Sequence, residues 1–100
     1  NFVYPIIKAG IISHTKQMGV YYAPYKININ CISPGGIEGK IKGKKKLQES
    51  KFKKRYISRV PLRRFCNPSD IAEVCSFLSK DENSYITGQN IILDGGFSLI

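Results

Sequence analysis

A tyrosine and a lysine four residues apart near the start of the chain, Tyr4 and Lys8, have the residue types and the spacing needed for proton transfer. On a helix, residues at positions i and i+4 lie on one face about 5–6 Å apart, so the phenol and the ammonium would project into the same space. A cation held beside a phenol favours the phenolate form. Tyr4 could therefore both donate and accept a proton near neutral pH, as general acid–base catalysis requires.

The same spacing occurs a second time, from Tyr22 to Lys26. That copy spans Pro24, which has no amide proton and would break a helix there, so its two side chains need not share a face. The first copy contains Pro5, but in the first turn of a helix, where the missing donor costs little. Because so short a pattern also arises by chance, the downstream sequence must distinguish the two copies.

Hydrophobic periodicity predicts the elements that would position these side chains. Apolar residues recur at spacings of three, four and seven over residues 4–22, which predicts a helix. Gly10 and Gly19 weaken this helix but permit the close approach of another helix. Alternating β-branched residues predict a strand over 26–32. The glycine-rich turn at 33–36 follows, and in an open α/β sheet ligands bind at the carboxyl ends of strands. A purely structural turn is the alternative.

The second half of the chain predicts one more helix and one more strand. The run 67–70, Asn-Pro-Ser-Asp, has a capping residue, a proline for the first helical position and an acid that favours the helix dipole, and the helix should end near Lys80. Residues 89–93 are apolar with little alternation, which predicts a strand covered on both faces, as in a parallel sheet. The apolar tail 97–100 would pack on a partner subunit or on its own domain.

Length and composition favour one small globular domain. The chain has 100 residues, of which 42% are hydrophobic. It contains no apolar run near the ~18 residues that span a bilayer, and its first ten residues lack the features of a signal peptide. Three cysteines without a C-x-x-C spacing indicate neither a disulfide framework nor a zinc site. We therefore expect a cytoplasmic protein without a metal site, with Cys31 and Cys75 in its core.

The net charge of +9 is concentrated in residues 40–59, which hold ten basic residues and one acidic residue. Weak apolar periodicity over 38–58 predicts one mobile helical piece, which we interpret as a lid. Three roles for the charge remain open: a solvated excursion, a site for an anionic substrate, or a patch for nucleic acid or an acidic partner. Few aromatic residues accompany the lysines, which makes nucleic acid the less favoured partner.

Several motifs, in this order and spacing, resemble the C-terminal part of a short-chain dehydrogenase/reductase. The motifs are Tyr4-x-x-x-Lys8-Ala9-Gly10, the run 30–37, Pro61-Leu62 with Arg64, the run 68–72, and the run 86–89 ahead of Asp94-Gly95-Gly96. The resemblance implies an α/β fold, the C-terminal portion of a Rossmann-like doubly wound parallel sheet with about two strands and flanking helices. Residues 1–100 would be the C-terminal part of one such domain, and 40–59 its variable substrate loop.

The resemblance also implies hydride transfer between NAD or NADP and a small carbonyl or alcohol substrate, with sugar-related and anionic compounds among the candidates. Tyr4 matches the catalytic tyrosine, and Lys8 matches the lysine that favours the phenolate and bonds the nicotinamide ribose. The loop of Pro34, Gly35, Gly36 and Ile37 matches the one that borders the nicotinamide, with the Ile37 backbone near the carboxamide. Gly39 stands where the family often has a threonine. The family forms homodimers and homotetramers.

The resemblance further implies what would lie upstream of Asn1: the glycine-rich dinucleotide-binding half of the domain and the catalytic serine. We therefore expect the hundred residues alone to be inactive and to fold poorly. Two alternatives to the oxidoreductase remain. One is a non-catalytic chain that retains only assembly surfaces, and the other is a nucleic-acid or acidic-partner binder acting through residues 40–59.

Overall fold

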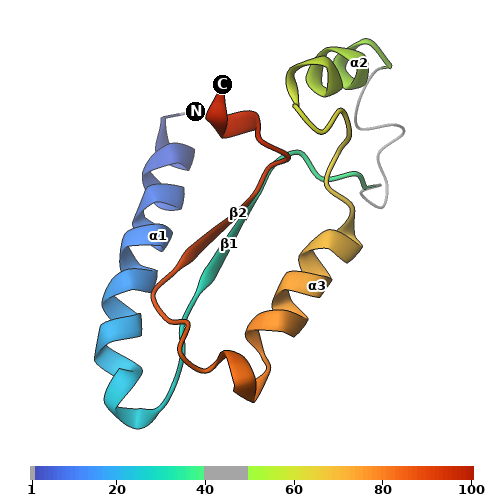
Figure 1. Cartoon of the computed structure of the whole chain (residues 1–100). Helices are drawn as coiled ribbons and strands as arrows, with labels where there is room; N and C mark the ends of the chain where they lie inside the picture. The colour runs from blue at the N-terminus through green and yellow to red at the C-terminus, as the bar shows by residue number, and fades with distance from the viewer. Residues whose placement is uncertain (1, 40–49) are drawn as a thin grey trace. The chain divides into compact units, whose positions relative to one another are not determined.

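The computed structural model describes residues 2–39 and 50–100, and residues 40–49 of the expected lid lie outside the described residues. Within the described ranges the elements, in chain order, are α1 (Val3–Tyr22), η1 (Ala23–Tyr25), β1 (Cys31–Pro34), α2 (Ser50–Arg59), α3 (Pro68–Leu78), η2 (Asp81–Asn83), β2 (Asn90–Leu93) and η3 (Phe97–Leu99) (Figure 1). The predicted helices and the second strand are confirmed, the latter beginning one residue later than expected.

The strands β1 and β2 pair with each other. The Cys31 amide donates to the Gln89 carbonyl, and the Gly35 amide donates to the Leu93 carbonyl, each at 2.9 Å. The offset between donor and acceptor is the same at both positions, which only parallel strands give. The predicted α/β fold with a parallel sheet is therefore confirmed.

The chain divides into two compact units. The first comprises Asn1–Ser33 and Val74–Ile91, and the second comprises Pro34–Glu73 and Ile92–Ile100. Each strand begins in the first unit and ends in the second. Helix α1 belongs to the first unit and helix α2 to the second.

In the first unit, α1 packs against the turn that precedes β2. A Cβ added at Gly19 would lie 2.8 Å from the Gly88 Cα, so the backbones of helix and turn are in direct contact. Thr15 is buried on the same helix, and its hydroxyl donates to the Ile11 carbonyl at 2.8 Å. The expected helix–helix approach is wrong for the described residues, because Gly19 meets a turn and nothing lies within 4 Å of a Cβ added at Gly10.

The expectation of a strand over 26–32 is wrong at its start, because β1 begins at Cys31. Lys26 has a left-handed backbone, with φ 58°. Residues 27–30 face the irregular segment before β2, and only part of their bonding to it is between backbone groups. The Gly88 amide donates to the Ile29 carbonyl at 2.7 Å, whereas other bonds involve side chains. The Ile29 amide, for example, donates to the Thr87 hydroxyl at 3.1 Å. A regular strand therefore starts only where its partner β2 begins.

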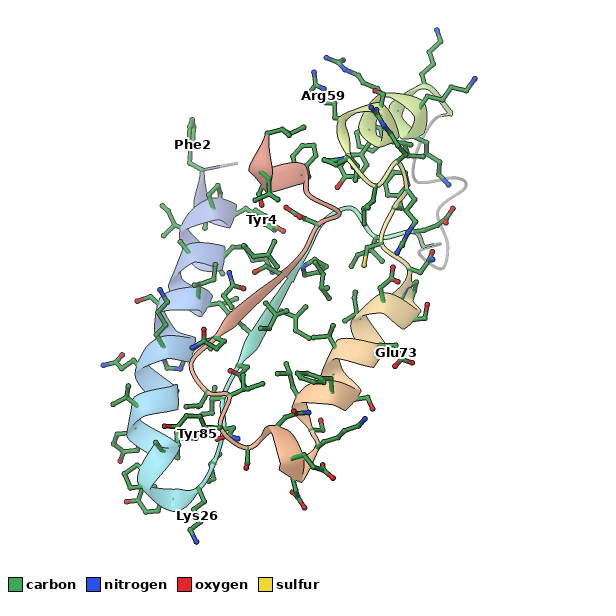
Figure 2. The ribbon with its side chains drawn as sticks, viewed as in Figure 1. Phe2, Tyr4, Lys26, Arg59, Glu73 and Tyr85 are labelled. Atoms are coloured by element: carbon green, nitrogen blue, oxygen red, sulfur yellow. The ribbon has the colours of Figure 1, made fainter. Side chains whose placement is uncertain are left out.

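An aromatic cluster organises the second unit. The Tyr56 ring of α2 stacks on Phe65 with 4.7 Å between ring centroids and on Phe97 with 5.6 Å. Phe65 and Val60 are buried, with exposed fractions of 5% and 1%. Basic side chains project outward from α2 around Arg59, as Figure 2 shows. The helix predicted within the basic segment is thus confirmed over the residues the structure describes.

Two burial predictions are wrong. Ile92 of β2 is 55% exposed and lines a pocket, so this position of the strand is not covered on both faces. Cys75 of α3 is exposed, because it lies at the edge of a half-buried stripe formed by Ile71, Val74 and Leu78. The other residues of β2 are half-buried.

Candidate functional site

The tyrosine and lysine singled out above lie on the first two turns of α1, in the first unit. The Lys8 Nζ is 5.4 Å from the centroid of the Tyr4 ring, so the four-residue spacing brings ammonium and phenol together as predicted. Tyr4 is 62% exposed (Figure 2), and its hydroxyl has no hydrogen-bond partner among the described residues. An accessible phenol beside a cation is able to exchange a proton with a bound group.

The second tyrosine–lysine copy has a different backbone. Tyr22 is the last residue of α1, whereas Lys26 follows η1 in a left-handed conformation. The Tyr22 ring packs edge-on against Tyr21, with 5.0 Å between ring centroids. As predicted, the helix does not continue through this copy, and the two copies differ although their spacing is the same.

The glycine turn, Pro34–Ile37, lies in the second unit and begins at the last residue of β1. The Gly35 amide donates to the Leu93 carbonyl at 2.9 Å, and the Gly36 amide donates to the Tyr56 hydroxyl at 2.5 Å. A Cβ added at Gly36 would lie 2.7 Å from the Tyr56 ring. Neither glycine has a positive φ. Close packing, not an unusual backbone conformation, therefore accounts for glycine at this position.

Ile37, at the end of this turn, presents two backbone groups. It forms an isolated parallel bridge with Cys66, in which the Cys66 amide donates to Gly36 and the Glu38 amide donates to Cys66, both at 2.9 Å. Since the residues flanking Ile37 make these bonds, its own N–H and C=O point away from Cys66. Neither has a partner among the described residues. One donor beside one acceptor fits a carboxamide, which carries one of each.

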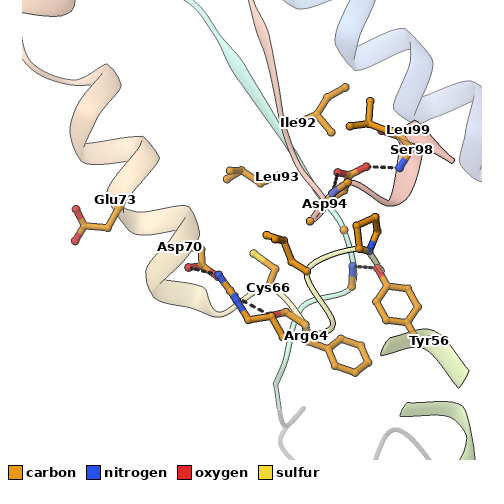
Figure 3. Close-up of a pocket in the computed structure, with 17 residues that line it drawn as sticks. Tyr56, Arg64, Cys66, Asp70, Glu73, Ile92, Leu93, Asp94, Ser98 and Leu99 are labelled. Carbon is orange, nitrogen blue, oxygen red and sulfur yellow. Dashed lines mark hydrogen bonds and ion pairs between the residues drawn. The ribbon is translucent and has the colours of Figure 1, made fainter. Parts of the chain in front are cut away.

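A pocket of about 760 Å³ lies in the second unit (Figure 3). Its walls come from Gly35 and Gly36 of the turn, Tyr56 of α2, the segment 61–66, the start of α3 and the residues from Ile92 onward. The lining is mostly apolar, and the volume is in the range of small-molecule sites, about 300–1,000 Å³. The turn therefore borders a space large enough for part of a cofactor or substrate.

Asp94 lies at the end of β2 and contributes a carboxylate to this pocket. Its Oδ1 accepts a hydrogen bond from the Gly96 amide at 2.9 Å, and its Oδ2 accepts one from the Ser98 amide at 2.7 Å (Figure 3). Hydrogen bonds from Ser98, and then from Gly96, hold the pKa of Asp94 below its usual range. The carboxylate is thus ionised at neutral pH and fixes the start of η3.

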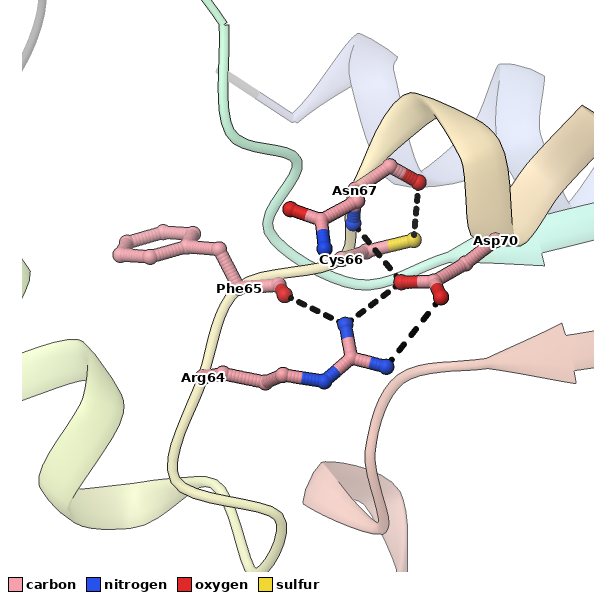
Figure 4. A network of polar contacts seen from close by, with 5 residues as sticks. All are labelled: Arg64, Phe65, Cys66, Asn67 and Asp70. Carbon is pink, nitrogen blue, oxygen red and sulfur yellow. Dashed lines mark hydrogen bonds and ion pairs between the residues drawn. The ribbon is translucent and has the colours of Figure 1, made fainter.

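Arg64 and Asp70 form an ion pair beside the pocket (Figure 4). The Arg64 Nη1 is 2.5 Å from the Asp70 Oδ2, which also accepts the Asn67 amide at 2.8 Å. The bond from Arg64, followed by that from Asn67, holds the pKa of Asp70 below its usual range, and Asp70 raises the pKa of Arg64. Burial raises the pKa of the nearby Cys66 thiol. These groups hold the start of α3 in place.

Sequence reasoning missed the role of Tyr56 as the neighbour of the glycine turn. The local signal was present, because Phe52 and Tyr56 are four residues apart in a helix that is otherwise mostly charged or polar. Their rings stack with 6.3 Å between centroids. The spacing indicates an apolar face of α2, but it does not indicate which segment that face meets.

Other expectations concern what the chain lacks. Among residues 2–39 and 50–100, no group of three or more side chains could hold a metal ion. Cys31, Cys66 and Cys75 are free thiols. None of the helices that the structure describes is both long enough and apolar enough to span a membrane.

Parallel strands separated by helices, with a glycine turn at the carboxyl end of the first strand, define a protein of the doubly wound α/β class. A family model described as enoyl-(acyl carrier protein) reductase matches residues 1–98. Together with the relatives below, this match places the chain in the short-chain dehydrogenase/reductase family, as its motifs predicted.

Two curated relatives and one solved structure illustrate the similarity. The 3-oxoacyl-[acyl-carrier-protein] reductase FabG of Thermotoga maritima is 43% identical over 93 residues, covering 93% of this chain and 37% of the relative. The 7alpha-hydroxysteroid dehydrogenase of Paraclostridium sordellii is 37% identical over 97 residues, covering 96% and 36%. A short chain dehydrogenase from Leptospira borgpetersenii, with bound NAD+, superposes with a TM-score of 0.84 at 47% identity, covering 96% of this chain and 35% of that one.

The chain therefore spans little more than a third of the length of these relatives. The names of the two curated relatives refer to two different substrates, although both proteins have a similar sequence identity to this chain. Family membership alone thus gives the class of protein and the fold, and the chemistry has to be argued from the residues.

Proposed function

We propose that the whole protein is an NAD- or NADP-dependent oxidoreductase that transfers a hydride to or from a carbonyl or alcohol substrate. The observation that carries this proposal is the side-by-side placement of Tyr4 and Lys8 on α1, with 5.4 Å between the Lys8 Nζ and the ring centroid. Family membership supports it, as does the NAD+ bound to the similar Leptospira protein.

In this mechanism Tyr4 donates its hydroxyl proton to the substrate oxygen when an alcohol is formed, and removes that proton in the reverse direction. The Lys8 ammonium stabilises the phenolate that remains and hydrogen-bonds the ribose of the cofactor. The cofactor supplies or accepts the hydride when it is bound. The free N–H and C=O of Ile37 would hold its carboxamide, and Pro34, Gly35 and Gly36 would let that backbone segment approach the nicotinamide.

The charge of α2 supports an anionic substrate. Lys53 forms a long ion pair of 3.5 Å with Glu38, and the other basic side chains of α2 have no ion pair within the described part of the chain. Few carboxylates would therefore compete with a negatively charged substrate group, such as a phosphate, for the basic side chains of α2. The nucleic-acid alternative loses support, because Tyr56 stacks on Phe65 and Phe97 and is not presented to a base.

The test is Tyr4→Phe in the whole protein, with NADH- and NADPH-dependent reduction of a panel of carbonyl compounds as the assay. We expect a loss of turnover of about 10²–10⁴-fold, the usual contribution of a general acid–base group. Binding of the reduced cofactor should persist, because the ring and Lys8 remain. Tyr22→Phe, in the second tyrosine–lysine copy, is the matched control and should leave turnover unchanged. If turnover survives Tyr4→Phe, the non-catalytic alternative is favoured.

We also propose a cytoplasmic homodimer or homotetramer. The free thiols fit a reducing compartment. Exposed apolar side chains on α1, which include Ile6, Ile7 and Val20, would be covered by a second subunit.

A further inference from the structure

The Tyr56 hydroxyl lies against the glycine turn. It accepts a hydrogen bond from the Gly36 amide at 2.5 Å, and it would lie 3.1 Å from a Cβ added at Gly35 (Figure 3). Among the described residues it is the partner of that amide. Gly36 is half-buried, so an amide left without this partner would lose free energy wherever water did not replace the bond.

The Tyr56 ring is fixed independently of its hydroxyl. It stacks almost parallel on Phe65, at an interplanar angle of 16°, and on Phe97, at 15°. Phe65 is 5% exposed, so one of these partners belongs to the core of the second unit. The hydroxyl therefore reaches Gly36 from a ring that is packed between other side chains, not from a free surface side chain.

Gly36 depends on such external contacts. Glycine restricts its own backbone least of all residues, so its two dihedral angles must be set from outside. The Tyr56 hydroxyl holds the peptide plane before Gly36, and the Cys66 amide, which donates to the Gly36 carbonyl at 2.9 Å, holds the plane after it. The second plane includes the N–H of Ile37. The C=O of Ile37 lies in the next plane, which the bond from the Glu38 amide to the Cys66 carbonyl holds. Together the three bonds orient the Ile37 backbone groups.

We propose that Tyr56 is a positioning residue for the nicotinamide cofactor. By fixing the peptide before Gly36, its hydroxyl holds the free N–H and C=O of Ile37 in the orientation that receives the carboxamide. This inference rests on the proposed function.

The test is Tyr56→Phe in the whole protein, which removes the hydroxyl and keeps the stacked ring. The dissociation constants of NADH and NADPH are measured by the fluorescence of the reduced nicotinamide. We expect binding to weaken about threefold to tenfold, the effect of losing one hydrogen bond. The turnover number at saturating cofactor should stay within about twofold, because Tyr56 touches no reacting atom. Tyr85→Phe, at a fully exposed ring, is the matched control and should change neither quantity.

Amide hydrogen exchange without cofactor gives a second readout. In Tyr56→Phe the Gly36 amide should exchange at least about threefold faster, whereas Gly35, whose amide donates to Leu93, should be unaffected. Unchanged exchange at Gly36 would overturn the inference, and so would faster exchange with unchanged cofactor affinity. If neither dinucleotide binds the unmodified protein, the proposed function fails as well; if Tyr4→Phe alone behaves unexpectedly, only the proposed function fails.

Discussion

Gly19 in the first unit and Gly36 in the second both sit where a side chain would collide with a neighbour, but the neighbours differ in kind. At Gly19 an added Cβ would lie 2.8 Å from backbone atoms of Gly88, whereas at Gly36 it would lie 2.7 Å from the ring of Tyr56. A backbone cannot yield without shifting a whole segment, whereas a ring can turn. Helix α1, which carries Tyr4, therefore packs on backbone that cannot easily shift. The proposed cofactor turn packs on the Tyr56 side chain, which can change its position.

Gly19→Ala tests the rigid side of this comparison and should have the larger effect on stability. The new methyl group meets the Gly88 backbone, and overpacking of this kind costs about 1–3 kcal/mol. The measurement is the free energy of unfolding from urea denaturation. Gly10→Ala on the same helix is the control, because nothing lies within 4 Å of its added Cβ. It should stabilise the protein by up to about 1 kcal/mol. Equal effects at both positions would contradict the direct contact of α1 with the turn.

Gly36→Ala tests the adjustable side and should cost less, about 1 kcal/mol, because the Tyr56 ring can move away. In a Tyr56→Ala background the collision disappears, so a double-mutant cycle should show a coupling of about 0.5–1 kcal/mol. Gly39→Ala, where nothing lies within 4 Å, is the matched control. If the cost of Gly36→Ala persists without the Tyr56 ring, the turn is fixed by something other than α2.

The same contrast explains how much the sequence could predict. The helix of the Tyr4–Lys8 pair, the start of α3 at Pro68 and the strand β2 follow from local patterns, namely periodicity, a proline suited to the first helical turn and an apolar run. The side-by-side placement of Tyr4 and Lys8 follows from helical spacing alone. These features were predicted because every residue involved lies within one element.

Features that depend on distant segments were missed. The bond from Gly36 to Tyr56 joins residues 20 positions apart, and no local pattern specifies it. The parallel bridge from Ile37 to Cys66, which leaves the Ile37 backbone groups free, is likewise a long-range contact. The strand expected over 26–32 was wrong at its start for a related reason, because its facing segment is irregular. The pairing partner, not the β-branched residues, decides where β1 begins.

Asp70→Asn should give the smallest effect, since the Arg64–Asp70 pair is largely exposed and water screens it. The pKa of Asp70 is lowered from its ordinary value of 3.8 by Arg64 and Asn67, so its contribution to stability is present above about pH 4 and is lost as the pH falls through the folded-state value. The unfolding free energy of Asp70→Asn should therefore lie slightly below that of the unmodified protein near pH 6, and the two should converge near pH 2. The carboxylate of Asp81 has no partner among the described residues. Asp81→Asn should therefore give a plot of unfolding free energy against pH that runs parallel to that of the unmodified protein. If the difference in unfolding free energy between Asp70→Asn and the unmodified protein were the same at all pH values, Asp70 would hold the start of α3 through its shape and not through its charge.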